Sequence, residues 1–317
     1  MEVNRKNFLT VEDLGPEVLN HLVTQALKLD NANGSQSDLL RGKIVGIYFR
    51  VSSTRTRTAF TVAAMRLGAQ VVQYGPADLQ ITTGETPRDT GRVLSQYLDA
   101  LVVRTNQTLS EMKDFADQDR MSVINAMSEN EHPTQAIADL VTIYEALRRL
   151  QDVHVLYIGE GNNTTAALAL AISQIPRMRL TIACPPGYGL SNDLSGKCLD
   201  LAKKYGSSIE FCDNINDLPT GVDVVYTTRW LTMGVPKGDL NWREKFAPFQ
   251  ITPTLMEKVS KGRDTIFLHD LPAMRGCEVV DEVLDGPQSI AFRQAYHKQS
   301  SAMAILEWCT LTRNNVR

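Results

Sequence analysis

Short apolar segments alternate with helix-like segments along almost the whole chain. β-branched and aromatic residues cluster in the short segments, which are therefore expected to be buried strands. Strand–helix alternation is typical of parallel sheets with helices on both faces, so the sequence predicts an α/β fold with doubly wound sheets. The 317 residues suffice for two such units, divided near residue 149. The expected strands are 44–49, 71–74, 100–103, 122–126, 153–158, 180–184, 209–211, 222–226 and 265–268.

Two of the expected helices carry specific predictions. One begins at Pro87 and is expected to turn Val93, Leu94 and Tyr97 inward, because these residues recur at helical spacing. The other covers 299–312 and ends the regular structure of the chain.

Composition limits the classes of protein to which the chain can belong. Its hydrophobic content of 43% and charged content of 22% are typical of a soluble globular protein, and a net charge of -3 gives no general attraction for nucleic acid. The first residues form no apolar signal segment, and no apolar run approaches the length of a membrane span, so no membrane partner is expected. The five cysteines lie in the second half without C-x-x-C pairing, which favours reduced thiols in the cytoplasm and argues against zinc.

Polar or cationic side chains follow several of the expected strands at their carboxyl ends. In open parallel sheets, ligands bind outside the carboxyl ends of the strands. These side chains are therefore expected to line one ligand-binding rim. They are Arg55, Arg104, His132, Arg229 and His269.

The hydroxyl-rich segment 52–58 lies at a predicted strand-to-helix junction. Ser and Thr side chains cap helices at such junctions, and the first backbone N–H groups of a helix lack partners. Those groups, the helix dipole and the guanidinium of Arg55 form an anion site, most naturally for phosphate. Arg104 adds a second guanidinium, and His132 and Gln135 would reach a small polar group attached to the phosphate. The alternative for the isolated segment is a capped helix with two solvated arginines.

Familiar phosphate and cofactor motifs are missing. The sequence has no G-x-x-x-x-G-K-[ST], which excludes a nucleotide P-loop. The turn at 159–164 has the first two glycines of a dinucleotide-binding turn but not the third, and the next strand ends in Cys184-Pro185-Pro186 without an acidic residue for a ribose. A dinucleotide-dependent oxidoreductase is therefore not supported, and no Ser-His-Asp or Cys-His pattern indicates a covalent nucleophile.

Four segments form a pattern in their order and spacing: S-T-R-T-R at 53–57, Arg104, H-P-T-Q at 132–135 and H-D-L-P at 269–272. This pattern resembles the aspartate/ornithine carbamoyltransferase family, more closely its ornithine branch, and the resemblance covers essentially the whole chain. It implies two α/β domains with a cleft between them. Residues 1–149, completed by a returning C-terminal helix at 296–317, would bind carbamoyl phosphate, and residues 150–295 would bind an amino-acid acceptor. It also implies a homotrimer with active sites shared between neighbours, and no metal or organic cofactor.

The resemblance assigns roles in binding the carbamoyl donor. Arg104 looks like the arginine that bridges phosphate and carbonyl oxygen, and His132 and Gln135 look like the groups on the carbamoyl oxygen and amide. Arg55, Arg104 and His132 would be the catalytic residues. The implied carbamoyl phosphate-binding residues are Ser53, Thr54, Arg55, Thr56, Gln80, Arg104, His132, Gln135, Leu271 and Lys298.

Three of these residues have particular expectations attached to them. Gln80 resembles the residue that reaches into the adjoining subunit's site. Leu271 would hold the carbamoyl NH2 through its backbone carbonyl. Lys298 occupies the place of a family arginine, so the charge survives but the bidentate guanidinium does not.

The acceptor side departs from the family. Ornithine enzymes usually carry Asp in a strand-end motif Y-T-D-x-W-x-S-M-G, whereas residues 226–234 read Y-T-T-R-W-L-T-M-G, so Thr228 replaces that Asp. Arg229 follows, as an arginine follows Thr in aspartate enzymes to bind a carboxylate, and Asp270 stands where ornithine enzymes have Cys. The expected acceptor-binding residues are Asn163, Thr228, Arg229, Thr232, Met233 and Asp270.

These replacements predict an acceptor that is an amino acid with a second amino group but is not held as ornithine is. Asp270 would supply the negative partner that Thr228 no longer offers, and Arg229 would take a carboxylate. A shorter diamino acid such as 2,3-diaminopropionate fits, and ornithine itself stays open. A second hypothesis is a catalytically silent assembly or regulatory subunit, against which the retained carbamoyl phosphate positions argue.

Overall fold

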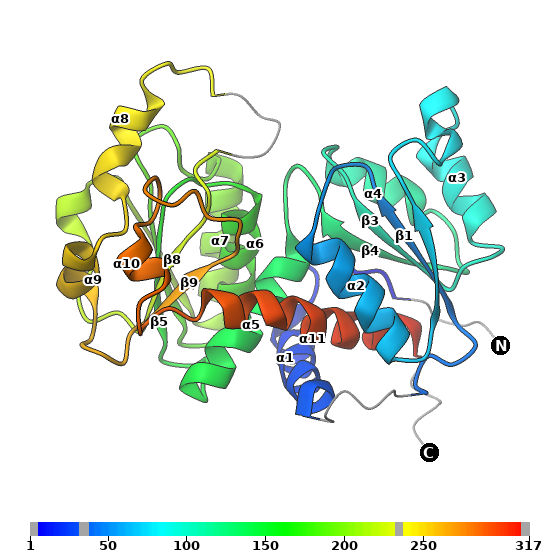
Figure 1. The fold of residues 1–317 in the computed structure, drawn as a ribbon, viewed down its shortest axis with the longest axis horizontal. Coiled ribbons are helices and arrows are strands. Elements are labelled where there is room, and N and C mark those ends of the chain that lie inside the picture. Colours follow the sequence, from blue (N-terminus) through cyan, green and yellow to red (C-terminus); the bar gives the residue numbers. More distant parts are fainter. Residues whose placement is uncertain (1–5, 32–37, 232–236, 312–317) are drawn as a thin grey trace. The chain divides into compact units, whose positions relative to one another are not determined.

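The computed structural model describes residues 6–31, 38–231 and 237–311, and the chain divides into two compact units (Figure 1). The first unit consists of Met1–Val141 and His297–Arg317, and the second of Thr142–Tyr296. Each unit contains one parallel sheet, so the predicted pair of parallel α/β units is confirmed. The second unit begins at Thr142 and ends at Tyr296, whereas the family resemblance implies an acceptor-binding domain over 150–295.

The first unit is built on four parallel strands in the order β2-β1-β3-β4. All five residues of β3 are buried, because this strand has neighbours on both edges and helices on both faces. A Cβ at Gly46 in β1 would approach Leu98 Cδ1 to 2.5 Å, so a larger residue there would displace this core side chain. The strands are β1 Ile44–Phe49, β2 Gln70–Tyr74, β3 Ala100–Arg104 and β4 Ser122–Met127.

Helices cover both faces of this sheet because the chain adds strands on both sides of β1. It first adds β2 on one side and then crosses back to add β3 and β4 on the other side. Right-handed crossovers therefore put the helix after β1 on one face and the helices after β2 and β3 on the opposite face. On that second face, Leu94, Met112 and Phe115 pack against Leu101 and Val103 of β3. The helices are α1 Gly15–Asn31, α2 Arg55–Arg66, η1 Gln80–Thr83, α3 Pro87–Leu94, α4 Leu109–Phe115 and parts of α5 Pro133–Leu147 and α11 Ala291–Thr310.

The second unit has five parallel strands in the order β7-β6-β5-β8-β9. An apolar core in this unit joins Leu156 of β5, Val225 of β8 and Phe267 of the edge strand β9 to Phe246 and Met256 from the helices after β8. The strands are β5 His154–Ile158, β6 Arg179–Ala183, β7 Ser208–Cys212, β8 Val224–Thr227 and β9 Ile266–His269. The helices are α6 Asn163–Ile172, α7 Asn192–Tyr205, η2 Ile215–Asp217, α8 Trp242–Phe246, η3 Ala247–Phe249, α9 Pro253–Val259 and α10 Asp281–Leu284.

Two details of the sequence prediction were wrong. Helix α3 ends at Leu94, so only Leu94 of the three expected inward residues is buried, whereas Val93 is 49% and Tyr97 68% exposed. The helical spacing did not apply to Tyr97 because it lies beyond the helix. The last helix begins at Ala291 rather than at residue 299.

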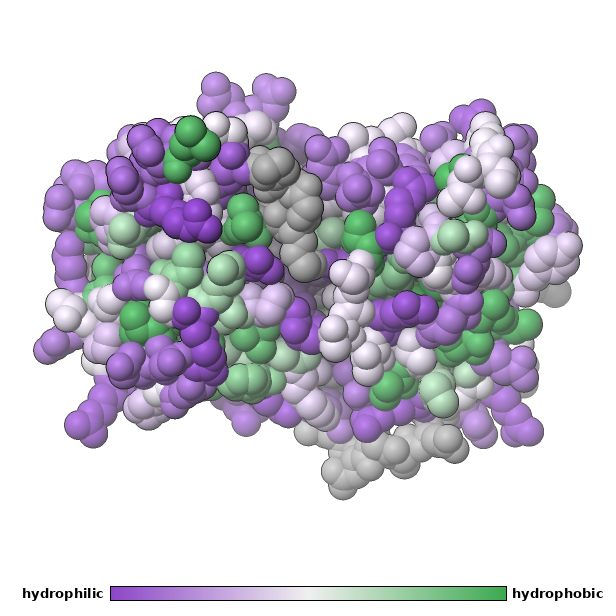
Figure 2. All heavy atoms as spheres, turned by 45° about the horizontal axis from the view of Figure 1, so that its top comes forward, coloured by the Kyte–Doolittle hydropathy of each residue, from purple (hydrophilic) through white to green (hydrophobic). Residues whose placement is uncertain are grey.

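One face of the molecule is mixed in character (Figure 2). Hydrophilic and hydrophobic side chains are interspersed over the face drawn in Figure 2. None of the described helices combines the length and the hydrophobicity needed to span a membrane.

Candidate active site

The order of strands in the first sheet reverses between β1 and β3, and ligands bind at such a reversal, outside the carboxyl ends of the strands. The end of β1 leads into Ser53 and the residues after it, and β3 ends on Arg104. The backbone N–H of Arg50 donates to the carbonyl oxygen of Arg104 over 2.9 Å, which joins the two strand ends. Topology therefore brings two of the predicted phosphate-binding segments next to each other.

Helix α2 begins at Arg55, in the segment that follows the end of β1 at Phe49. Thr54 occupies the N-cap position but makes no side-chain cap hydrogen bond, so the expected capping was wrong for this residue. The reason is that Thr54 has helical backbone angles (φ -75, ψ -56), whereas a capping side chain needs an extended backbone. The positive end of the helix dipole is thus left for an anion. Thr56 is buried, Ser53 and Arg55 are half-buried, and Thr54 is exposed.

Arg104, His132 and Lys298 interact electrostatically, and each is buried, with no more than 7% of its surface exposed. Burial lowers the pKa of His132 well below its usual range, and the positive charges of Lys298 and Arg104 lower it further. His132 is therefore a neutral imidazole near neutral pH, and it can donate one N–H to a developing oxyanion without adding a third charge. Two cations around a neutral donor suit a dianionic phosphate that carries a polar carbonyl group.

Gln135 is held from both sides. Its Nε2 donates to Asp139 Oδ1 over 2.7 Å, and its Oε1 accepts a hydrogen bond from Lys298 Nζ. Gln135 and Asp139 are completely buried, so this chain of contacts fixes the orientation of the amide. Sequence reasoning missed Asp139, although its position four residues after Gln135 on a helix would have pointed to it. The residues Ser53, Thr54, Arg55, Thr56, Arg104, His132, Gln135 and Lys298 are called the first half-site below.

Glu131 ties the loop that carries His132 to the N-terminal segment. Its carboxylate accepts hydrogen bonds from the Thr10 hydroxyl at 2.6 Å and from the Val11 N–H at 2.7 Å. Burial raises the pKa of Glu131 to about 7, against the opposing effect of these two hydrogen bonds. This residue was also missed, because its partners lie about 120 positions away in the sequence.

Glutamine at position 131 is expected to remove a pH dependence of stability. Because the pKa of Glu131 is higher in the folded chain (about 7) than its usual 4.5, the folded state holds the proton more tightly. This contribution to the free energy of unfolding is complete below about pH 4.5 and is lost as the pH rises to about 7. Glu131→Gln should therefore gain stability relative to wild type across that window, by up to about 3 kcal/mol.

Denaturant unfolding at several pH values measures this difference. Glu129→Gln, an exposed position in the same loop, is the control and should follow the wild-type profile. Parallel profiles for Glu131→Gln and wild type would contradict the expectation.

Gln80 is the first residue of η1 and is exposed, with its side-chain Oε1 accepting a hydrogen bond from the Thr83 hydroxyl at 2.8 Å. It belongs to the first unit, as do all members of the first half-site. Its reach into a neighbouring subunit stays a prediction.

The strand order of the second sheet reverses between β5 and β8. Asn163 follows β5 and Thr228 and Arg229 follow β8 at this reversal, whereas Asp270 follows the edge strand β9. Thr228 is 1% exposed and its hydroxyl is fully engaged. It accepts from Asn162 Nδ2 at 3.0 Å and lies 2.9 Å from the Tyr157 hydroxyl. The Tyr157 hydroxyl itself donates to the Glu160 carbonyl, so its oxygen accepts the Thr228 proton. Thr228 therefore forms part of the wall of this site, because its hydroxyl is already bonded within the protein and is not free to bond a ligand.

Arg229 and Asp270 are charged residues that follow the neighbouring strands β8 and β9. Asp270 Oδ2 accepts a hydrogen bond from the Thr164 hydroxyl at 3.1 Å, and its side chain is 16% exposed. Within the described part of the chain, Arg229 forms no hydrogen bond or ion pair, and its Nε is buried without a partner. Asn163, the first residue of α6, is half-buried. Thr232 and Met233 lie outside the described residues.

Leu271 is held in a left-handed backbone conformation, with a φ of 53°. Its N–H donates to His269 Nδ1 over 2.9 Å, which requires the proton of the neutral imidazole to be on Nε2. That nitrogen lies 3.1 Å from Glu278 Oε1, and both His269 and Glu278 are completely buried. This conformation costs energy for a non-glycine residue, so the buried contacts are what hold the loop in place. The second half-site consists of Asn162, Asn163, Thr164, Thr228, Arg229, Asp270 and Leu271.

Comparison with protein families identifies the class. The aspartate/ornithine carbamoyltransferase carbamoyl-P binding domain matches residues 6–145, and the Asp/Orn binding domain of the same family matches residues 151–309. The chain belongs to the aspartate/ornithine carbamoyltransferase family.

Individual relatives place it on the ornithine side of that family. Ornithine carbamoyltransferase from Caldicellulosiruptor saccharolyticus is 39% identical over 310 residues, which cover 97% of this chain and 99% of that relative. Ornithine carbamoyltransferase from Anoxybacillus flavithermus is 37% identical over 309 residues, covering 96% and 97%. The solved enzyme from Pyrococcus furiosus superposes with a TM-score of 0.90 at 32% identity and covers 98% of both chains. The protein is thus an enzyme, a carbamoyltransferase similar to ornithine carbamoyltransferases.

Proposed function

We propose that the enzyme transfers the carbamoyl group from carbamoyl phosphate to an amino group of a diamino acid that is bound differently from ornithine. The first half-site supplies the donor end of this reaction. Its two buried cations, Arg104 and Lys298, and the N-terminus of α2 match the charge of a dianionic acyl phosphate.

The chemistry follows from the types of residue present. The neutral acceptor amine attacks the carbamoyl carbon, a nitrogen–carbon bond forms, and negative charge develops on the carbonyl oxygen. Arg104, His132 and Thr56 stabilise that charge as donors fixed in advance. The carbon–oxygen bond to phosphate then breaks, and a phosphate oxygen takes the proton that the amine loses, so no protein base is needed. Gln135 and the carbonyl of Leu271 orient the carbamoyl NH2.

The observation that carries the choice of acceptor is the pair of charges in the second half-site. Asp270 presents a carboxylate that suits an ammonium group, and Arg229, which has no ion-pair partner among the described residues, suits a carboxylate. Thr228 is neutral, buried and occupied by Tyr157 and Asn162, so the family's usual ammonium partner is missing at this position. If Asp270 holds the ammonium and Arg229 the carboxylate of a diamino acid, the second amino group of that acceptor is left to react with the carbamoyl carbon.

The proposal also covers the length of the acceptor's carbon chain. A short diamino acid such as 2,3-diaminopropionate is proposed, and ornithine is the alternative because the relatives are named for it. A catalytically silent assembly or regulatory subunit is the other alternative, and the intact first half-site argues against it.

A panel of amines tests this proposal. Purified enzyme with carbamoyl phosphate is offered ornithine, 2,4-diaminobutyrate, 2,3-diaminopropionate and putrescine, and phosphate release is measured together with the ureido product by mass spectrometry. Highest kcat/KM with a diamino acid shorter than ornithine is expected. Ornithine as clearly the best acceptor would overturn the altered specificity, and no product from any amine would favour the silent subunit.

Assembly and location complete the proposal. We propose a homotrimer in the cytoplasm, in which Gln80 of one subunit contributes to the site of a neighbour. The exposure of Gln80 on η1 and the five free thiols are in keeping with this proposal. Analytical ultracentrifugation tests the trimer.

A further inference from the structure

Lys237 lies in the second unit, and its side chain is only 6% exposed. Its ammonium contacts the carboxylate of Glu160, which follows β5. It also lies over three aromatic rings, at 4.9 Å from the centroid of Tyr188, 5.3 Å from Trp242 and 4.8 Å from Phe246. Burial of a lysine ammonium costs free energy unless the charge has a partner. Here the Glu160 carboxylate and the faces of the aromatic rings are both partners of the charge.

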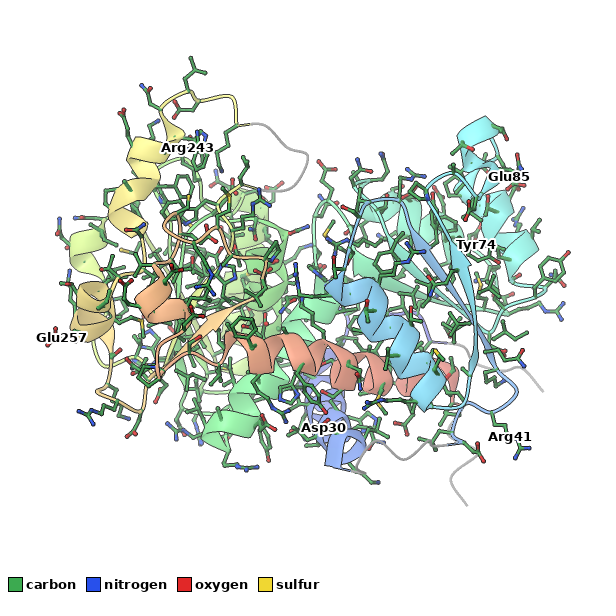
Figure 3. All side chains as sticks on the ribbon, viewed as in Figure 1. Asp30, Arg41, Tyr74, Glu85, Arg243 and Glu257 are labelled. Carbon is green, nitrogen blue, oxygen red and sulfur yellow. The ribbon has the colours of Figure 1, made fainter. Side chains whose placement is uncertain are left out.

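The aromatic cage, which consists of Tyr188, Trp242 and Phe246, is held by its own packing. Tyr188 meets Phe246 edge-on with 4.8 Å between centroids, and Trp242 meets Phe246 at 5.7 Å. Arg243, labelled in Figure 3, lies over the Trp242 ring at 4.6 Å. The rings therefore do not depend on Lys237 for their arrangement, and the ammonium is the part that connects them to Glu160.

Glu160 in turn belongs to the turn that builds the second half-site. Its backbone carbonyl accepts hydrogen bonds from the Tyr157 hydroxyl at 2.6 Å and from the Thr165 hydroxyl at 2.8 Å. The next residue, Gly161, donates its N–H to the carbonyl of Tyr188 at 2.7 Å, so the same turn is tied to the cage a second time. A Cβ on Gly161 would lie 2.4 Å from the backbone of Gly189, which shows how closely these segments approach.

The contacts continue from this turn to the acceptor-binding groups. Asn162 and Tyr157 hold Thr228, and the Asn162 side-chain oxygen also accepts from the N–H groups of Thr164 and Thr165. Thr164 then donates to Asp270. Displacement of Glu160 would therefore be transmitted to both the wall of the second half-site and its carboxylate.

We propose that Lys237 is a positioning residue for acceptor binding: its caged ammonium holds Glu160 and so fixes the turn between β5 and α6. A lysine that only filled space would be replaced by an apolar side chain without loss. Removal of the charge instead leaves the Glu160 carboxylate without its ion-pair partner in a largely buried place, and the turn shifts to rehydrate it. The role in acceptor binding rests on the proposed function, whereas the role in fixing the turn does not.

The experiment compares Lys237→Met, which keeps length and packing but loses the charge, with Lys245→Met. Lys245 is the matched control because it also lies near the cage, 6.0 Å from the centroid of the Tyr188 ring. Among the described residues its only ion-pair partner is Asp239, so its removal leaves the partner of Glu160 in place. Lys237→Met is expected to raise the KM of the acceptor about tenfold and to leave the KM of carbamoyl phosphate unchanged. Hydrogen–deuterium exchange in a peptide spanning 157–165 should rise in Lys237→Met and not in Lys245→Met. Lys237→Arg, which restores a cation, should recover part of the acceptor KM.

The outcomes separate the two proposals. Unchanged exchange at 157–165 in Lys237→Met overturns the positioning of the turn, whatever the acceptor is. Raised exchange with an unchanged acceptor KM overturns the link to acceptor binding. Failure of the wild-type enzyme to use any amine refutes the proposed function, while the exchange measurement still decides whether Lys237 fixes the turn.

Discussion

Replacing Arg104 with glutamine is expected to lower kcat/KM for carbamoyl phosphate by about 10²- to 10³-fold, the loss typical when one preorganised donor to an oxyanion is removed. Arg104 lies at the carboxyl end of β3, at the reversal of strand order, and is 6% exposed. Its charge therefore acts in a poorly solvated place, where an electrostatic interaction is stronger than at the surface. Glutamine keeps a hydrogen-bond donor but neither the charge nor the planar fork of a guanidinium.

Steady-state kinetics with both substrates varied measures the change, and far-UV circular dichroism checks the fold. Arg120→Gln is the control, because Arg120 is an exposed arginine of the same unit that bonds Gln96. The Arg104 variant should also raise the pKa of His132, since Arg104 is one of the charges that lower it. Activity of Arg104→Gln within threefold of wild type would contradict the role given to this residue.

Much of the fold could be predicted because its signals are local. The apolar run 44–49 matches β1, and the run before Arg104 matches β3 up to one residue. Arg104 is the last residue of β3 and Arg229 follows β8 closely, as the expected strands indicate without any knowledge of side-chain contacts, whereas His132 lies farther along the loop after β4, directly before α5. Helix ends were less predictable, since Tyr97 fits the spacing of α3 but lies beyond its last turn.

The contacts that support the site could not be predicted, because they join distant parts of the chain. Lys298 reaches Gln135 across 163 positions, and Glu131 reaches Thr10 across 121. The sequence shows which residue types are present, but nothing in it indicates that Glu160 and Lys237 meet, since an acidic residue in a turn is ordinarily solvated. The contacts of Thr228 with Tyr157 and Asn162 are of the same kind, and they are the reason why recognition of the acceptor is proposed for Asp270 instead.

Replacing Asp270 with asparagine is expected to lower kcat/KM for the acceptor by roughly 10- to 100-fold, which is the effect of losing a hydrogen bond to a charged group. Asparagine has nearly the same shape and keeps an oxygen that accepts from the Thr164 hydroxyl, so the loop after β9 should stay in place. The kinetic constants for carbamoyl phosphate should not change, because the groups proposed to hold its phosphate belong to the first unit.

Asp264→Asn provides the matched control for this substitution. Asp264 precedes β9 and is exposed, whereas Asp270 follows the same strand at its carboxyl end, so the two variants remove the same charge at opposite ends of one element. The acceptor used is the best amine from the panel, and initial rates of ureido product formation give kcat/KM. An analogue of the acceptor that lacks this ammonium group should react more slowly than the acceptor in the wild-type enzyme. If Asp270 binds the ammonium, the two compounds should have similar kcat/KM in Asp270→Asn. Equal kcat/KM in Asp270→Asn, Asp264→Asn and wild type would mean that another group holds the ammonium, and the altered acceptor site would then have to be explained by Arg229 alone.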